Sequence, residues 1–268
     1  MNSKRRVVVK IGTSTITHKT GKLNLRRLDT LARVMTDLRN AGSDLILVSS
    51  GAIATGAGTL GLASFPNELR FKQAAAAVGQ CRLMHVYDKL FGEYGQQVAQ
   101  ILLSRQDIDE PDRRHNLIST FEALLEWGVL PVVNENDSVT PEEIEHAGTR
   151  IFGDNDTLSA VVAKLVGADL LVLLTDIDGL YDSDPRENPS AALIPEVSEI
   201  TDALRAASGG AGSARGTGGM ITKLSAASIA LESGFEMVIA RGDNPEALYD
   251  IAAGKKVGTR FRQLTVES

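Results

Sequence analysis

The stretch that decides the fold is residues 131–160, PVVNENDSVTPEEIEHAGTRIFGDNDTLSA. The apolar run 129–133 predicts a buried strand that ends at 134–137, NEND, and the sequence 153–156, GDND, opens an apolar helical pattern. Strand and helix ends are where α/β proteins place ligands. Two polar clusters lie there, namely Asn134, Asn136 and Asp137, and Asp154, Asn155 and Asp156. Amides and carboxylates in this position suit a small zwitterion better than a lipid or a nucleic acid.

Strands and helices alternate on both sides of this stretch. Apolar, β-branched runs predict strands at 6–11, 44–49, 97–104, 129–133, 169–174 and 236–240. Helical spacing of apolar residues predicts helices at 25–38, 67–94, 113–127, 158–166 and 221–232, with one more after Asn244 and Pro245. Such alternation is typical of an α/β protein whose mostly parallel sheet is covered on both faces. We expect two lobes, 1–165 and 166–268, that share one continuous sheet.

Composition excludes several classes of protein. The chain has 268 residues, 43% of them hydrophobic and 23% charged, as in ordinary globular proteins. Its net charge of −6 argues against nucleic-acid binding, which needs a basic face. Lys10 and Gly12 interrupt the apolar N-terminal run, and no uncharged run approaches membrane-spanning length, so we expect a cytoplasmic protein without a membrane partner. The single cysteine, Cys81, excludes an internal disulfide, and we interpret it as a core thiol.

Three glycine-containing turns follow predicted strands or open helices, at 10–14, 49–52 and 216–223. Small residues let backbone N–H groups converge on an anion, and a helix that begins there adds its positive dipole end. Lys10 and Lys223 lie beside two of these turns and can each add a point charge. One such turn alone is better interpreted as a tight turn with a solvated lysine, but the three together predict phosphate binding.

Other familiar patterns do not fit. The sequence 56–61, GAGTLG, matches GxGxxG but does not directly follow a strand, and a P-loop pattern is absent. The four histidines lack the spacing of a metal site or a triad, and Ser50 is not in a GxSxG elbow. Dinucleotide-binding, P-loop and hydrolase interpretations are therefore disfavoured.

The lack of an obvious general base also indicates a type of reaction. A carboxylate acceptor, with a pKa of about 4.3, is already ionised at neutral pH and needs no base. Phosphoryl transfer to it requires positioning and cations, which Lys10, Lys223 and Mg²⁺ would supply. We expect a nearby carboxylate, Asp154, to hold both ammonium groups.

Six motifs together resemble one family. VVVKIGTS, LVSSGAIATG, PVVNENDSV, FGDNDTLSA, LLTDIDGLYDSDPR and GTGGMITK occur in the order and spacing of the glutamate 5-kinases (γ-glutamyl kinases) of the amino-acid kinase family, over Val7 to Phe261. The resemblance implies a three-layer αβα sandwich with a mostly parallel central sheet. It also implies ATP-dependent phosphorylation of the γ-carboxylate of L-glutamate to L-glutamyl 5-phosphate, the first step of proline biosynthesis.

The resemblance implies roles for individual residues. Lys10 and Lys223 would stabilise the transferring phosphoryl group, and Asp154 would orient them. The glutamate-binding residues would be Ser50, Asp137 and Asn155, with Asn134 and Asp156 lining the pocket. The nucleotide would contact Lys10, Thr175, Asp176, Thr217, Gly218, Gly219, Met220, Ile221, Thr222 and Lys223. Metal ligands stay unassigned.

Further expectations concern regulation and assembly. The resemblance implies that loop 140–151 closes over the substrate and senses proline, that the 1–165 lobe binds substrate and the 166–268 lobe binds nucleotide, and that the chain forms a dimer or tetramer. The glycine-rich stretch 208–219 predicts a mobile loop. Many relatives continue into a C-terminal PUA domain, which is not present before the chain stops at Ser268.

Two alternatives stay open. Other members of the superfamily act on acetylglutamate, aspartate, carbamate or UMP with the same lysines, although a carboxylate at Asp137 favours a free amino acid. A non-catalytic regulator would have lost Lys10, Asp154 or Lys223, which this chain retains.

Overall fold

The computed structural model describes residues 4–18, 20–139, 155–183, 185, 188, 190–207 and 219–263. The expected closing loop 140–151, nearly all of the expected mobile loop 208–219, and the site candidates Asp154, Thr217 and Gly218 lie outside the described residues.

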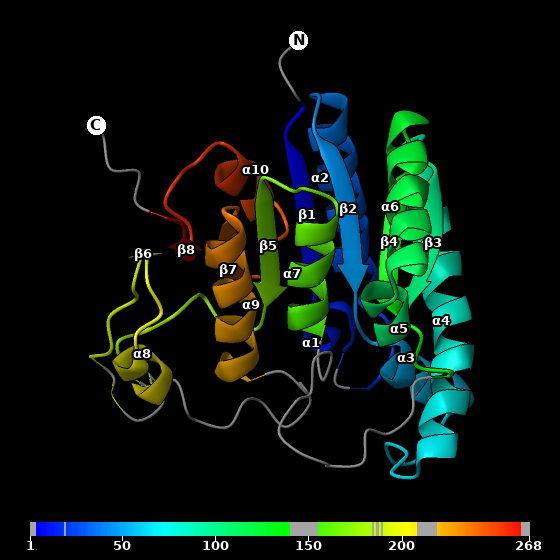
Figure 1. Ribbon diagram of the computed structural model, residues 1–268. Helices are drawn as coiled ribbons and strands as arrows, with labels where there is room; N and C mark the ends of the chain where they lie inside the picture. The colour runs from blue at the N-terminus through cyan, green and yellow to red at the C-terminus, as the bar shows by residue number, and fades with distance from the viewer. Residues whose placement is uncertain are drawn as a thin grey trace.

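A single eight-stranded sheet runs through the molecule in the order β3-β4-β2-β1-β5-β7-β8-β6 (Figure 1). Its strands are β1 (Arg6–Ile11), β2 (Asp44–Ser49), β3 (Val98–Leu103), β4 (Leu130–Glu135), β5 (Leu170–Thr175), β6 (Glu196–Val197), β7 (Glu236–Arg241) and β8 (Thr259–Phe261). Neighbouring strands are parallel except β7 and β8, which are antiparallel. The prediction of a mostly parallel central sheet is confirmed.

The sequence of the central strands explains why they are covered on both faces. In β1, Val7, Val9 and Ile11 pack into the core on one face, and Val8 packs into the core on the other. A strand whose side chains alternate between two apolar cores must itself be apolar throughout. The apolar residues 7–9 of β1 and 170–174 of β5 fit the positions of these strands in the middle of the sheet.

Helices form the outer two layers. They are α1 (Thr13–Ile16), α2 (Leu25–Asn40), α3 (Ala52–Leu60), α4 (Leu69–Gly92), α5 (Arg105–Asp109), α6 (Pro111–Glu126), α7 (Asn155–Leu165), α8 (Asp202–Ala207), α9 (Met220–Ser233) and α10 (Ala247–Ala252). The core on one face receives side chains from α2, α4 and α10, and the core on the other from α6, α7 and α9. Figure 1 shows α6, α7 and α9 side by side in front of the sheet. The αβα sandwich is thus confirmed.

All strands and helices predicted from sequence are present, and several short elements were not predicted. The most consequential is α3, which covers most of the GAGTLG stretch at 56–61. A Cβ at Gly56 would lie 1.8 Å from the carbonyl oxygen of Ala75, and one at Gly79 would lie 1.8 Å from that of Ala52. These glycines let α3 and α4 pack backbone against backbone, which is why the pattern resembles a dinucleotide motif without being one.

Three further expectations can be compared with the fold. Cys81 is exposed on α4, so its interpretation as a core thiol is wrong.

The segments 1–165 and 166–268 meet where β1 pairs with β5, within one continuous sheet. Their division into two lobes stays a prediction. Across the described ranges, no helix combines the length and apolar character that crossing a membrane requires.

Candidate active site

The site candidates gather at one edge of the sheet. Because β1, β2, β4 and β5 are parallel, their carboxyl ends share this edge, which is the lower one in Figure 1. Lys10 lies near the end of β1, Ser50 directly follows β2, Asn134 lies near the end of β4, and Thr175 ends β5. All four side chains are buried. The expectation that strand ends bring these residues together is therefore met by the topology.

Helix N-termini add positive dipole ends to the same edge. Helix α3 directly follows β2 after a tight turn at Gly51, whose φ of 92° is in the left-handed region that favours glycine. Helices α7 and α9 begin at Asn155 and Met220, next to the buried residues of the site. Unpaired N–H groups in the first turns of helices favour bound anions.

A carboxylate and two ammonium groups form the buried centre of the site. Asp156 lies in the first turn of α7 and is 1% exposed. Its Oδ1 is 2.5 Å from Lys10 Nζ, and its Oδ2 is 3.0 Å from Lys223 Nζ. Thr222 Oγ1, from α9, lies 3.0 Å from the same Oδ2. Lys10 and Lys223 thus reach one carboxylate from β1 and α9, both of which pack against α7.

The electrostatics of this centre favour its charged form. Burial alone would raise the pKa of Asp156, but the nearby charges of Lys10 and Lys223 and their hydrogen bonds hold it well below its ordinary value. The carboxylate is therefore ionised at any physiological pH. Among the described residues of this centre, two ammonium groups contact one carboxylate.

Sequence analysis expected a different role for this carboxylate. We expected Asp154 to hold both lysines and Asp156 to line the glutamate pocket, whereas the side chain that contacts both lysines is Asp156. Asp154 lies outside the described residues. Asp156 thus bridges the two lysines in the described part of the site, and the role expected of Asp154 stays a prediction.

Three side-chain amides and a hydroxyl form a second cluster beside the lysines. Asn155 Nδ2 lies 2.8 Å from Ser50 Oγ and 3.2 Å from Asn134 Oδ1. Asn134 Nδ2 donates to Gln80 Oε1 at 2.9 Å. Asn155 Oδ1 is buried and has no hydrogen-bond partner among the described residues. A buried acceptor without a partner is costly unless a ligand supplies a donor.

Asp137 stands at the edge of this amide cluster, just beyond β4. Burial raises the pKa of its carboxyl group to about 6. A small cavity of about 10 Å³, enough for roughly one water, is lined by Asp137 together with Gln80, Ala52 and Ala76. A cationic group placed beside Asp137 would return the pKa of its carboxyl group towards the ordinary value.

The nucleotide candidates are only partly described. Thr175 Oγ1 donates to Asp176 Oδ1 at 3.1 Å, at the end of β5. Gly219 caps α9 and Thr222 contacts Asp156, whereas Ile221 is exposed. The first turn of α9 therefore brings Thr222 to the carboxylate that contacts both lysines.

The described ranges contain no group of three or more His, Cys, Asp or Glu side chains able to hold a metal ion. Mg²⁺ is commonly bound through one or two carboxylates and the phosphates of a nucleotide, with water filling the rest. At such a site, Mg²⁺ would take most of its ligands from the phosphates of a nucleotide and from water.

Sequence reasoning missed two polar residues of α4 that contact the site. Gln80 accepts from Asn134, and the hydroxyl of Tyr87 lies 2.8 Å from Ser49 Oγ at the end of β2. Burial raises the pKa of Tyr87 to about 12, so this hydroxyl stays protonated. The available signal was a glutamine and a tyrosine seven residues apart on the buried face of a long helix.

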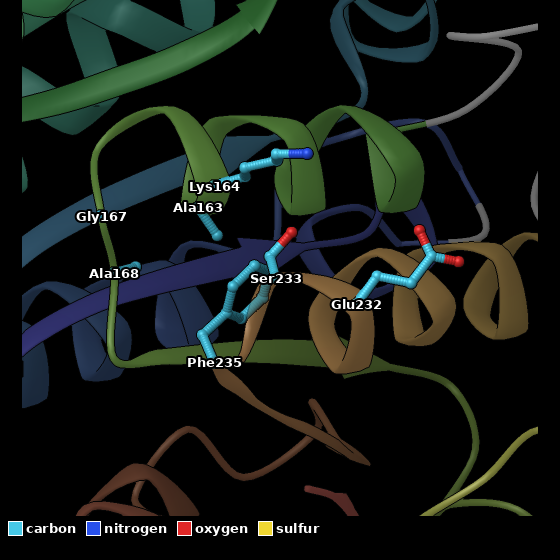
Figure 2. Close-up of a pocket in the computed structure, with 7 residues that line it drawn as sticks. All are labelled: Ala163, Lys164, Gly167, Ala168, Glu232, Ser233 and Phe235. Carbon is cyan, nitrogen blue, oxygen red and sulfur yellow. The ribbon is translucent and has the colours of Figure 1, made fainter. Parts of the chain in front are cut away.

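A larger cavity lies away from the site. It has a volume of about 250 Å³ and lies between the C-terminal ends of α7 and α9, as Figure 2 shows. Its lining residues are Ala163, Lys164, Gly167, Ala168, Glu232, Ser233 and Phe235. Asp156 is towards the other end of α7, seven residues or about 10 Å along the helix axis from Ala163 at 1.5 Å per residue. This cavity is not part of the lysine site.

Comparison with known proteins gives consistent matches along the chain. A sequence model described as "Amino acid kinase family" matches residues 5–241. The chain is 51% identical over 261 residues to a glutamate 5-kinase of Clostridium perfringens, covering 97% of this chain and 96% of that protein. It is 50% identical to a glutamate 5-kinase of Listeria monocytogenes, covering 97% of this chain and 94% of that protein.

Solved structures share the fold at lower identity. A carbamate kinase from Giardia lamblia bound to AMP-PNP is 17% identical, with a TM-score of 0.68, over 98% of this chain and 100% of that one. A UMP kinase from Ureaplasma parvum is 14% identical, with a TM-score of 0.65, over 97% and 99% of the two chains. At such identities the likeness extends to the fold alone.

Proposed function

The chain belongs to the amino acid kinase family, and within it to the glutamate 5-kinases, and on this premise we propose that it transfers the γ-phosphoryl group of ATP to the side-chain carboxylate of L-glutamate. The product is L-glutamyl 5-phosphate, the first intermediate of proline biosynthesis. The fold and the relatives support the reaction, and the geometry of the site supports the roles of the residues.

One observation carries the assignment of the catalytic centre: Asp156 holds Lys10 and Lys223 at 2.5 and 3.0 Å in a buried site. Phosphoryl transfer spreads negative charge over the oxygens of the transferring group, and fixed cations stabilise that charge. The ionised Asp156 fixes both ammonium groups before ATP arrives. Lys10 and Lys223 are thus the catalytic residues, and Asp156 positions them.

The acceptor needs no general base. The γ-carboxylate of glutamate, with a pKa of about 4.3, is ionised at neutral pH and attacks phosphorus directly. The reaction instead depends on in-line placement of two anions that repel each other. The lysines and the N-termini of α3, α7 and α9 reduce that repulsion.

The amide cluster and Asp137 supply recognition of the amino acid. Asp137 pairs with the α-ammonium of glutamate, and the unpartnered Oδ1 of Asn155 accepts a further hydrogen bond from it. Ser50 and Asn134 complete the glutamate-binding part of the site through their contacts with Asn155. An N-acetylated substrate has no ammonium group for Asp137, which favours free glutamate over acetylglutamate.

The nucleotide lies on the other side of the lysines. Thr175, Asp176 and the segment 217–223 bind ATP, and Mg²⁺ enters as the MgATP substrate complex. In this proposed arrangement, glutamate lies over the 1–165 half of the chain and ATP over the 166–268 half. The N-terminus of α9, with Thr222 beside Asp156, supports this arrangement.

Assembly and regulation complete the proposal. The chain forms a homo-oligomer, a dimer or tetramer, and L-proline inhibits it by feedback in the cytoplasm. Exposed apolar side chains around the start of α4 support self-association, namely Leu60, Leu62, Phe65, Phe71 and Val78. Size-exclusion chromatography with light scattering tests the oligomer, and assays with added L-proline test the inhibition.

The test of the reaction is hydroxylamine trapping of an acyl phosphate in the presence of MgATP. We expect hydroxamate with L-glutamate and none with N-acetyl-L-glutamate or L-aspartate. Product from either of the other two acids would preserve the fold and the lysine roles but overturn the pocket assignment. ATP binding without any product would favour a non-catalytic regulator.

The roles of the lysines have their own test. Lys223→Ala should lower kcat by at least about a hundredfold while changing the KM for L-glutamate little, because the ammonium group acts on the transition state. Lys164→Ala, at the far end of α7, serves as the matched control. A large rise in KM without loss of kcat would contradict the assignment.

A further inference from the structure

Gln80 is a buried polar residue that the proposed reaction does not yet use. It lies on α4, is 9% exposed, and faces the carboxyl end of β4. Its Oε1 accepts a hydrogen bond of 2.9 Å from Asn134 Nδ2. It also lines the small cavity next to Asp137. Gln80 therefore touches the substrate pocket from a helix that contributes no residue to the lysine centre.

The amides of Asn155, Asn134 and Gln80 form a chain of hydrogen bonds in which each donor amine points towards Gln80. An amide has a donor end and an acceptor end, so a bond at one end determines what the other end offers. Asn134 turns its donor to Gln80, which leaves its Oδ1 to accept from Asn155 Nδ2 at 3.2 Å. Asn155 Nδ2 also donates to Ser50 Oγ at 2.8 Å and to the carbonyl oxygen of Ser49 at 3.3 Å. Its Oδ1, at the other end of the amide, is the buried atom without a partner among the described residues.

The backbone holds Gln80 firmly in place. The neighbouring residue, Gly79, packs against the backbone of Ala52, and Gly56 packs in the same way against Ala75. Both contacts are too close for any side chain, so α4 cannot slide along α3 without breaking them. Gln80 consequently presents its acceptor at a fixed position.

We propose that Gln80 is a positioning residue for the amino-acid substrate: its acceptor sets the orientation of the Asn134 amide and, through it, presents Asn155 Oδ1 to the α-ammonium group. This inference rests on the proposed function, because it takes L-glutamate as the substrate. Without the Gln80 acceptor, Asn134 Nδ2 is a buried donor with no partner, which favours a flipped amide. A flipped Asn134 turns its donor to Asn155, whose own amide then flips as well. The Nδ2 donor of Asn155 then faces the ammonium group, which is also a donor and cannot accept from it.

The experiment compares three variants by steady-state hydroxamate kinetics. Gln80→Met keeps the length of the side chain and removes the strong acceptor, whereas Gln80→Glu keeps an acceptor oxygen. Gln96→Met is the matched control, because Gln96 is also buried and hydrogen-bonded but precedes β3, at the opposite edge of the sheet. Thermal melting of each variant reports on folding independently of catalysis.

We expect Gln80→Met to raise the KM for L-glutamate about tenfold or more, the factor that corresponds to one lost buried hydrogen bond. The KM for ATP should change less than about twofold, since the nucleotide lies beyond the lysines. Gln80→Glu should restore the KM for L-glutamate to within about threefold of wild type. Gln96→Met should lower the melting temperature while leaving both KM values unchanged.

A double variant tests whether Gln80 acts through Asn155. Residues that act through one contact show non-additive effects. Combined with Asn155→Ala, Gln80→Met should raise the KM for L-glutamate no further than Asn155→Ala does alone. Additive effects would overturn the proposed route.

Failure of this inference is distinguishable from failure of the proposed function. A wild-type protein that forms no hydroxamate from L-glutamate would refute the function and with it the role of Gln80. If wild type forms the product but Gln80→Met keeps its KM for L-glutamate within twofold, only the role of Gln80 is refuted. A parallel rise in the KM values for ATP and L-glutamate would likewise indicate a structural role and overturn the inference.

Discussion

At the scale of single residues, Asp156 joins two buried cations that come from distant parts of the chain. Asp156→Asn would leave both ammonium groups buried beside a neutral amide. Loss of one member of a buried ionic cluster typically costs about 3–5 kcal/mol. We expect a decrease of that size in the free energy of unfolding, measured by urea titration at pH 7.5, together with a loss of kcat.

The pH dependence of the same cluster has a definite sign. The pKa of Asp156 is lowered in the folded protein, so its ionised form contributes stability above its ordinary pKa and loses that contribution as the pH falls. The difference in stability between wild type and Asp156→Asn should therefore be constant from pH 6 to 8 and shrink below about pH 4. A difference that grows in acid would contradict this account.

Asp137 should behave in the opposite way. Burial raises the pKa of its carboxyl group to about 6, so the cost of the charged form begins above the ordinary pKa and is complete above about pH 6. Asp137→Asn should raise the free energy of unfolding at pH 8 by up to roughly 3 kcal/mol, an effect that disappears below about pH 4. It should also raise the KM for L-glutamate far more than the KM for ATP. An equal rise in both would argue against an ammonium contact.

The contrast between Asp154 and Asp156 shows what sequence could not resolve at this scale. The motif at 153–156 offers two carboxylates on either side of Asn155. Which of them faces the lysines depends on where α7 begins and on its rotation about its axis. Asp156, in the first turn of α7, is buried and contacts both lysines. The motif located the site, but the spacing alone could not show that Asp156 takes this position.

At the scale of elements, the contact between α3 and α4 depends on two glycines. Gly79→Ala would place a Cβ 1.8 Å from the carbonyl oxygen of Ala52, so the helices would have to separate. The loss should exceed the gain of about 1 kcal/mol that alanine brings to a helix. Gly92→Ala, at the end of α4 with nothing within 4 Å, should be neutral or stabilising. Chemical denaturation of the two variants compares them directly, and equal effects would contradict the packing account.

Helices and strands could be predicted where their apolar residues repeat with a clear helical or strand period. Long amphipathic helices such as α2 and apolar strands such as β1 were predicted within a few residues, because each buries a recognisable face. Helix α3 was missed because its glycines, at 56, 58 and 61, are typical of turns. The short strands β6 and β8 each have too few residues to show a pattern. Gln80 was missed because its partner, Asn134, is brought to it only by tertiary packing.

At the scale of the whole molecule, the sheet joins the two halves of the chain. Val7 to Ile11 of β1 pair in parallel with Leu170 to Leu174 of β5, and both strands are buried. Neither half can separate without exposing this pairing. We expect β2 and β7, one from each half, to have the same slowest amide-exchange rate and to lose protection at the same denaturant concentration. Hydrogen exchange with mass spectrometry measures both strands, and two separate transitions would show that the halves unfold independently.

The same arrangement determines what a shortened chain can do. Synthesis from the N-terminus delivers Lys10 early, Asp156 later and Lys223 only near the end. A ribosome that stops before Lys223 therefore releases a product with one of the two lysines and no β7 to pair with β5. Under the proposed roles, such a fragment lacks one of the two catalytic lysines. In a cell, incomplete translation of this message therefore yields an inactive fragment that proteases degrade, and not a kinase that consumes ATP without regulation.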